Sequence, residues 1–146
     1  MENELKKSIL LNAEPDAVWD MLTNPDKIEQ YMFGSRINTD WQPGSKVDFY
    51  MPKAGQEIIV VTGEVIRSDQ PRLLEHTLFP VGSTMEDIPE NYLTVTYELL
   101  PVDGGTELTV SQRDFSSVAQ GEKRYQDSQN GWKLVLPKMK EIVEQE

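Results

Sequence analysis

Cysteine is absent from the 146 residues, and histidine occurs once. The lack of cysteine excludes a disulfide framework, a thiolate zinc site and a cysteine nucleophile. The sequence also lacks a run of about 18 apolar residues that could span a bilayer. Its start lacks the basic stretch followed by an apolar run that marks a secretory signal. We therefore expect a cytoplasmic protein.

Basic residues are few. The sequence has 14 Lys and Arg residues and 25 Asp and Glu residues, which gives a net charge of -11. Such a surface repels phosphate backbones and anionic lipid headgroups, so we expect no nucleic-acid partner and no stable membrane insertion. Residues 117–146 instead carry equal numbers of basic and acidic side chains, which makes this segment the best surface for an acidic partner. Acidic charge that simply keeps the protein soluble is the plainer interpretation.

The length fits one domain, and no linker or internal repeat divides the sequence, so we predict a single domain over residues 1–146. Residues 5–12 alternate in polarity as a strand does. Pro15 and Pro25 then each stand at the start of a helical pattern, where a missing N–H costs least. The first strand is therefore expected to be followed by two short helices.

Alternation of apolar and polar residues replaces the helical period from residue 35 onward. It predicts strands near residues 36–41, 45–51, 57–68, 72–79, 91–101 and 105–113. The clearest hairpin joins the last two of these strands, because Asp103 and Gly104 can supply the positive φ angles that a primed turn requires.

The remaining helical pattern covers residues 117–146 and carries an apolar stripe from Trp132 to Val143. This stripe can cover the apolar face of the sheet, so the fold class is predicted to be α+β. Pro137 lies inside the pattern, where it removes one backbone hydrogen bond, and the helix should kink there.

Short motifs in this order resemble a known superfamily. They occupy residues 13–19, 22–25, 63–65, 70–74, 94–99, 104–110 and 131–132, with Leu136 after them. The pattern resembles the helix-grip domain of the START and birch-pollen-allergen-like (SRPBCC) superfamily and, within it, the branch named for the activator of heat-shock-protein-90 ATPase. The resemblance implies a curved antiparallel sheet of about six or seven strands, with two short helices and a long C-terminal helix enclosing a cavity.

The sequence departs from the family pattern at two places that bear on this cavity. The second helix of the family usually ends in an aromatic pair, where this chain has Tyr31 and Met32, and an aromatic residue often stands at the position of Leu78. These replacements imply a cavity of different shape. The functions of the superfamily range from lipid and polyketide binding to cyclase chemistry and chaperone stimulation, so the fold alone does not transfer one of them.

The resemblance places the cavity between the inner face of the sheet and the long helix. Alternation then predicts the side chains that point into it. The predicted ligand-binding residues are Tyr31, Met32, Val47, Phe49, Val61, Leu74, His76, Leu78, Leu93, Val95, Tyr97, Val110, Gln112, Trp132, Leu136 and Met139. His76 and Gln112 would be the polar contacts.

Catalytic and metal-binding residues are not predicted. His76 is a lone inward histidine, which is most often a satisfied core residue, and Glu75 must point to the opposite side of the strand, so the two cannot form a dyad. Glu86, Asp87 and Glu90 match no calcium loop and are interpreted as a solvated loop. No cofactor is expected.

The leading hypothesis is non-enzymatic binding of a small hydrophobic or amphipathic molecule, such as a lipid, a polyketide or a flavonoid-like aromatic, by a monomer. Two alternatives stay open. The first is a regulator that resembles the chaperone-ATPase activator and contacts a chaperone through its surface. The second is a cofactor-free cyclase or hydrolase that uses the same cavity.

Overall fold

The computed structural model describes residues 3–145 of the chain. Its strands are β1 (Glu4–Leu11), β2 (Arg36–Asn38), β3 (Lys46–Lys53), β4 (Gln56–Asp69), β5 (Leu73–Pro80), β6 (Leu93–Val102) and β7 (Gly105–Arg113). Its helices are α1 (Pro15–Thr23), α2 (Pro25–Tyr31), the short 3-10 helix η1 (Pro89–Asn91) and α3 (Gly121–Glu144). The predicted α+β order is confirmed.

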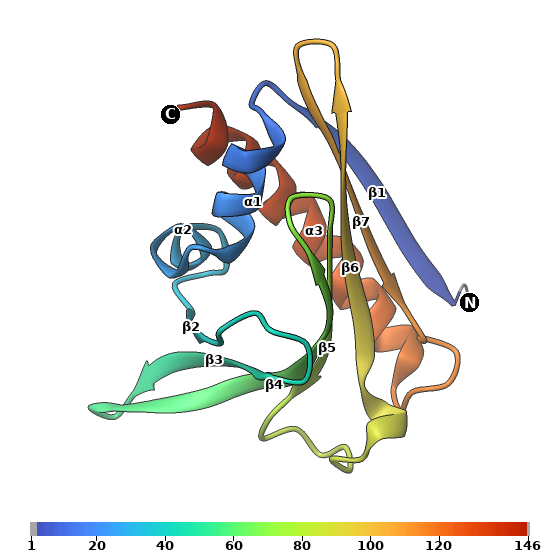
Figure 1. Cartoon of the computed structure of the whole chain (residues 1–146). Coiled ribbons are helices and arrows are strands. Elements are labelled where there is room, and N and C mark those ends of the chain that lie inside the picture. Colours follow the sequence, from blue (N-terminus) through green and yellow to red (C-terminus); the bar gives the residue numbers. More distant parts are fainter. Residues whose placement is uncertain (1–2, 146) are drawn as a thin grey trace.

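The seven strands form one antiparallel sheet in the order β1-β7-β6-β5-β4-β3-β2. The sheet curves, so that β3 and β4 run across the direction of β6 and β7, and α3 crosses behind it (Figure 1). This arrangement is the helix-grip fold that the motifs predicted. None of the helices within residues 3–145 has the length and apolar composition needed to cross a membrane.

The two short helices are held to each other by local hydrogen bonds. Asn24 caps α2, because its side-chain oxygen accepts from the N–H of Asp26 at 3.0 Å. The phenol of Tyr31, at the end of α2, donates to the carbonyl oxygen of Met21 in α1 at 3.1 Å. The end of α2 is thereby fixed near the inner face of the sheet.

The core lies between the inner face of the sheet and α3. Apolar residues on the inner face of the central strands are buried, among them Leu74, Val95 and Val110. The apolar stripe of α3 covers them, and its buried members are Trp132, Val135, Leu136, Met139, Ile142 and Val143. Pro137 is on the exposed side, and the helix is assigned continuously through it. The kink there stays a prediction.

Most element boundaries lie one to four residues from the expected ones. Three of these differences occur where a turn or a short helix interrupts the regular pattern. The strand expected to reach residue 41 ends at Asn38. The last helix begins at Gly121 rather than at Ser117, whose N–H bonds to the carbonyl oxygen of Asp114 in a turn. The sixth strand begins at Leu93, because the residues before it form η1.

The hairpin between β6 and β7 has the expected two-residue loop. Only one of the two loop residues has the expected backbone conformation. Val102 pairs with Gly105, and Gly104 has a φ of +85°. Asp103 does not have a positive φ, and both primed turn types need one at this first loop residue, so the prediction of a primed turn was wrong. Gly104 therefore holds the left-handed position of the turn, which glycine adopts without strain.

Gly104→Val is expected to destabilise the protein by about 1–3 kcal/mol, because a β-branched side chain resists positive φ. No atom lies within 4 Å of the site of a β-carbon there, so the effect would come from the backbone and not from a clash. Urea unfolding measures the change. The matched control is Asp103→Val, which should cost much less; equal costs for the two variants would contradict this explanation.

Candidate functional site

Four rings form a row across the inner side of the sheet, from the segment before β3 to α3. Trp41 meets His76 edge-on with ring centroids 6.1 Å apart, and His76 lies 6.3 Å from Tyr97. Tyr97 in turn meets Trp132 of α3 edge-on at 6.1 Å. Edge contacts of this kind stabilise aromatic pairs beyond their buried area. The row joins α3 to β5 and β6.

Gln112 of β7 lies beside this row, and only the oxygen of its side-chain amide is hydrogen-bonded. The indole Nε1 of Trp132 donates to Oε1 of Gln112 at 2.9 Å, and because an indole can only donate, the amide oxygen must face it. The amide NH2 of Gln112 has no hydrogen-bond partner among residues 3–145, although the residue is only 4% exposed. It offers two donors to a ligand.

This amide opens into a small groove between the end of α2 and α3. The groove has a volume of about 160 Å³. Its walls are Met32, Phe33, Gln112, Ser128, Gly131, Trp132 and Val135. Apart from Gln112 and Ser128, the walls are apolar or, at Gly131, bare backbone. We refer to this hollow as the inner groove.

Sequence reasoning found three of the residues that line the inner groove, namely Met32, Gln112 and Trp132. It missed Phe33, Ser128, Gly131 and Val135. The signal for the last three was present, since Ser128, Gly131 and Val135 lie on the same helical face as Trp132, and two of them are small.

The other predicted ligand-binding residues are brought together, but most of them pack against one another. The buried ones are Tyr31, Val47, Leu74, His76, Leu93, Val95, Tyr97, Val110, Leu136 and Met139. Phe49, Val61 and Leu78 are half-buried, as is Met32. These four lie on β3, β4, β5 and the end of α2, so one edge of the interior reaches solvent there. Their contact with a ligand stays a prediction.

Two aromatic residues beside this open edge have an unusual backbone. Phe33 has a φ of +56° and is 62% exposed, and Trp41 has a φ of +59°. Bulky side chains rarely adopt this left-handed conformation, which costs about 1–3 kcal/mol and is concentrated at functional sites. The indole of Trp41 is fixed by a hydrogen bond to the carbonyl oxygen of Thr23 at 3.2 Å.

His76 and Glu75 point to opposite faces of β5, as the alternation predicted. The Nδ1 atom of His76 is 2.9 Å from the carbonyl oxygen of Thr77, which fixes the proton on that nitrogen in the neutral ring. The carboxylate of Glu75 accepts from Thr96 at 2.7 Å, and both Arg67 and Arg113 donate to it at 3.2 Å. The pair therefore forms no catalytic dyad.

The titratable groups of the row are held in their neutral forms. Burial lowers the pKa of His76 below its ordinary value, against the smaller opposing effects of the Thr77 carbonyl and of Glu75. Burial also raises the pKa of Tyr97 well above its ordinary value. The row thus presents an uncharged wall.

Stability should consequently fall as the pH drops below 6.5, the ordinary pKa of histidine. The neutral His76 contributes stability above that value, and this contribution is lost as the pH falls through its lowered pKa in the folded protein, with a slope of at most about 1.4 kcal/mol per pH unit. The sequence has one histidine, so urea unfolding between about pH 7 and 5 isolates it. His76→Gln should flatten the slope; an unchanged slope would contradict the assignment.

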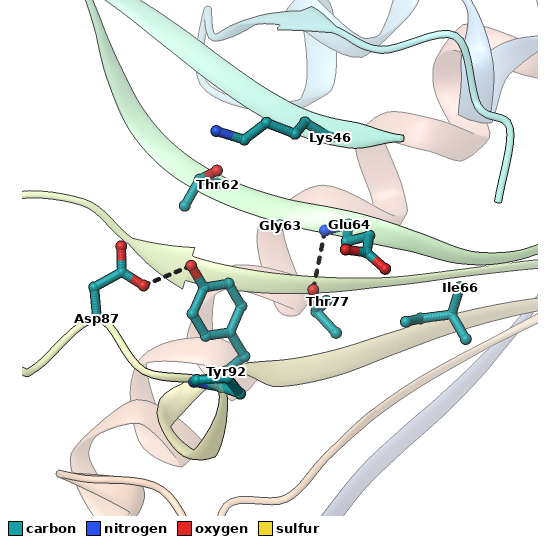
Figure 2. Close-up of a pocket in the computed structure, with 9 residues that line it drawn as sticks. Lys46, Thr62, Gly63, Glu64, Ile66, Thr77, Asp87 and Tyr92 are labelled. Atoms are coloured by element: carbon teal, nitrogen blue, oxygen red, sulfur yellow. Dashed lines mark hydrogen bonds between the residues drawn. The ribbon is translucent and has the colours of Figure 1, made fainter. Parts of the chain in front are cut away.

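A larger groove of about 410 Å³ lies on the opposite, outer face of the sheet. Figure 2 shows it between Lys46 and Thr62 on one side and Tyr92 on the other. Several of its polar groups already bond to one another or to neighbours. Tyr92 donates to Asp87 at 2.6 Å, and the Glu64 N–H donates to Thr77 at 3.0 Å. The inner groove, with its unpartnered amide, is therefore the stronger candidate site.

Comparisons with known proteins agree with this architecture. The solution structure of a Cytophaga hutchinsonii protein is 26% identical, with a TM-score of 0.77, and the match covers 99% of this chain and 97% of that one. A Mesorhizobium loti protein has 19% identity and a TM-score of 0.78, with 97% of each chain covered. At this low identity the likeness shows the fold.

A third solved structure is described as an HSP90 activator from Plasmodium falciparum. It shares 17% identity and a TM-score of 0.73, and the match covers 97% of this chain and 96% of that one, so it too shows the fold alone. The search of curated proteins gave no match. Residues 12–144 match the family described as Activator of Hsp90 ATPase homolog 1-like protein. The chain therefore belongs to this family, within the SRPBCC superfamily.

Proposed function

We propose that the protein binds a small hydrophobic or amphipathic molecule at the inner groove and does not transform it. The observation that carries this proposal is the side chain of Gln112, which lines an otherwise largely apolar hollow and whose NH2 group has no hydrogen-bond partner among residues 3–145. A ligand oxygen would accept from a donor that the described residues leave unpaired, and a typical hydrogen bond of this kind contributes about 0.5–1.5 kcal/mol. Members of this family often bind small ligands.

The chemistry of the walls defines the ligand. Met32, Phe33, Trp132 and Val135 favour an apolar or flat aromatic body, and methionine adapts to several shapes. The donors of Gln112 favour one hydroxyl or carbonyl oxygen on that body. Lipid alcohols, polyketides and flavonoid-like aromatics have this combination. Glu75 lies on the opposite face of β5 from His76 and cannot assist the imidazole as a partner in acid–base chemistry, which favours binding over catalysis.

A ligand of ordinary drug size needs the groove to widen, because about 160 Å³ is below the usual range of about 300–1,000 Å³. The parts best placed to move are the exposed Phe33 and the segment of α3 around residues 133–137, where Pro137 removes a backbone hydrogen bond. We also expect the loop at residues 80–90 to move, although it lines the outer groove and not the inner one.

The proposal is tested by NMR titration with uncharged probes, namely decanol, 1-naphthol and a neutral flavonoid. Binding should shift the side-chain amide of Gln112 and the indole N–H of Trp132. Gly131→Leu should abolish these shifts without loss of stability, because the new side chain would enter the groove, and no atom lies within 4 Å of its β-carbon. The control is Asn130→Leu, at the adjacent exposed position. Equal binding by both variants would refute the site.

Hydrogen exchange separates binding from chaperone regulation. A probe bound in the groove should slow exchange near residues 133–137 and 80–90, because binding stabilises the closed state by mass action. If a chaperone domain instead protects only the outer face of α3, where Leu134 is exposed, surface regulation becomes the better function and the groove is incidental.

A further inference from the structure

Arg124 is a buried cation for which the described chain provides only one hydrogen bond. It lies in the first turn of α3 and is 7% exposed. Its Nη1 donates to the carbonyl oxygen of Asn91 at 2.7 Å, whereas Nη2 is buried and has no partner. No carboxylate within residues 3–145 pairs with it. Arginine is rarely buried without a partner, so this arrangement calls for an anion.

The start of α3 beside Arg124 is also unsatisfied. Gln120 occupies the N-cap position in a left-handed conformation, and its side chain makes no capping hydrogen bond. Its amide nitrogen instead donates toward the hydroxyl of Thr84 at 3.4 Å. The first N–H groups of a helix have no acceptor within the helix, and the positive end of its dipole lies there. Both features attract negative charge.

Asn91 brings these two features together. Its carbonyl oxygen accepts from Arg124, and its side-chain oxygen accepts from the N–H of Ala119, immediately before the N-cap residue, at 2.9 Å. The guanidinium therefore lies where the segment that ends in η1 meets the start of α3, a contact visible in Figure 1. The unpartnered Nη2 lies within this contact rather than on the surface.

The surrounding charges select among anions. Glu86, Asp87 and Glu90 on the neighbouring segment and Glu122 in the first helical turn are exposed, so they remain hydrated carboxylates. They repel a dianion more strongly than a monoanion. A carboxylate suits the place better than a phosphate, and its two oxygens match the donor fork of a guanidinium.

We propose that Arg124 and the uncapped start of α3 form a binding site for one carboxylate group of a small molecule. Ser128, one turn further along the same helical face, lines the inner groove. Because Nη2 is buried, a carboxylate reaches it only when the contact between η1 and the start of α3 opens. A carboxylate-bearing amphiphile would then span both places, whereas a free small carboxylate would use Arg124 alone. The site does not depend on the proposed function, because uncharged ligands of the groove do not require it.

Thermal unfolding of the full chain in matched salts tests this inference. At equal ionic strength and about 100 mM anion, acetate should raise the melting temperature by about 2 °C over chloride, by mass action on the folded state. Arg124→Met should remove the difference between the two salts. Lys123→Met deletes one positive charge from the same turn at an exposed position and should keep the difference. If Arg124→Met does not fold, Arg124→Lys should reduce it, because lysine lacks the fork.

Decanoate compared with acetate distinguishes an amphiphile head group from a free small carboxylate as the ligand of Arg124. An Arg124-dependent shift that is larger with millimolar decanoate than with acetate identifies the head group of an amphiphile; equal shifts identify a free small carboxylate. The inference is overturned if acetate and chloride act alike on the wild type, if Arg124→Met keeps the acetate response, or if phosphate stabilises more than acetate. Failure of the uncharged probes at Gln112 would leave these outcomes unchanged.

Discussion

Trp132→Ala is expected to lower the free energy of unfolding by about 3–5 kcal/mol, the usual cost of removing a large buried aromatic side chain. The indole is 8% exposed, meets the ring of Tyr97 edge-on and donates to Gln112. Its removal leaves a cavity between α3 and the sheet and also leaves the amide oxygen of Gln112 without its donor. Urea unfolding followed by circular dichroism measures the loss.

Trp132→Phe separates the contribution of packing from that of the hydrogen bond to Gln112. A phenyl ring keeps most of the packing but cannot donate, so the buried oxygen of Gln112 loses its partner at a cost of about 1–3 kcal/mol. We therefore expect an intermediate stability. If Trp132→Ala left the unfolding midpoint unchanged, the indole would not couple the helix to the sheet, and the row of rings would have no structural role.

Gly63→Ala is expected to destabilise by about 3 kcal/mol or more, the upper end of overpacking effects. A β-carbon on Gly63 would lie 1.8 Å from the carbonyl oxygen of Thr77 and 2.6 Å from its carbonyl carbon. Those atoms belong to the backbone of β5 and cannot rotate away. The neighbouring strands β4 and β5 would have to separate, which would also disturb the half-buried Leu78.

The matched control for this clash is Gly131→Ala in α3. No atom lies within 4 Å of its β-carbon, so the same substitution should stabilise the helix by about 0.5–1 kcal/mol. Opposite signs for two glycine-to-alanine changes would show that the close approach of β5, rather than loss of chain flexibility, decides the effect at Gly63. A stabilising Gly63→Ala would contradict the strand geometry.

The candidate site could be predicted from the sequence only in part. Alternation placed His76 and Gln112 on the inner face and Glu75 on the outer one, and the structure agrees. It gave no indication that Gln112 would have a free amide, because that depends on the indole of Trp132, which lies 20 residues later in the chain. The bare backbone at Gly131 became part of a groove only when α2 packed against α3.

Local sequence patterns determined the elements of this protein, because helical and alternating periods and turn residues act between near neighbours. They predicted the seven strands, the two short helices and the apolar stripe of α3. Tertiary structure decided which groups lack partners and which strands touch. The burial of Arg124 against Asn91 and the close approach of Gly63 to Thr77 depend on contacts between segments distant in sequence, which a local period does not encode.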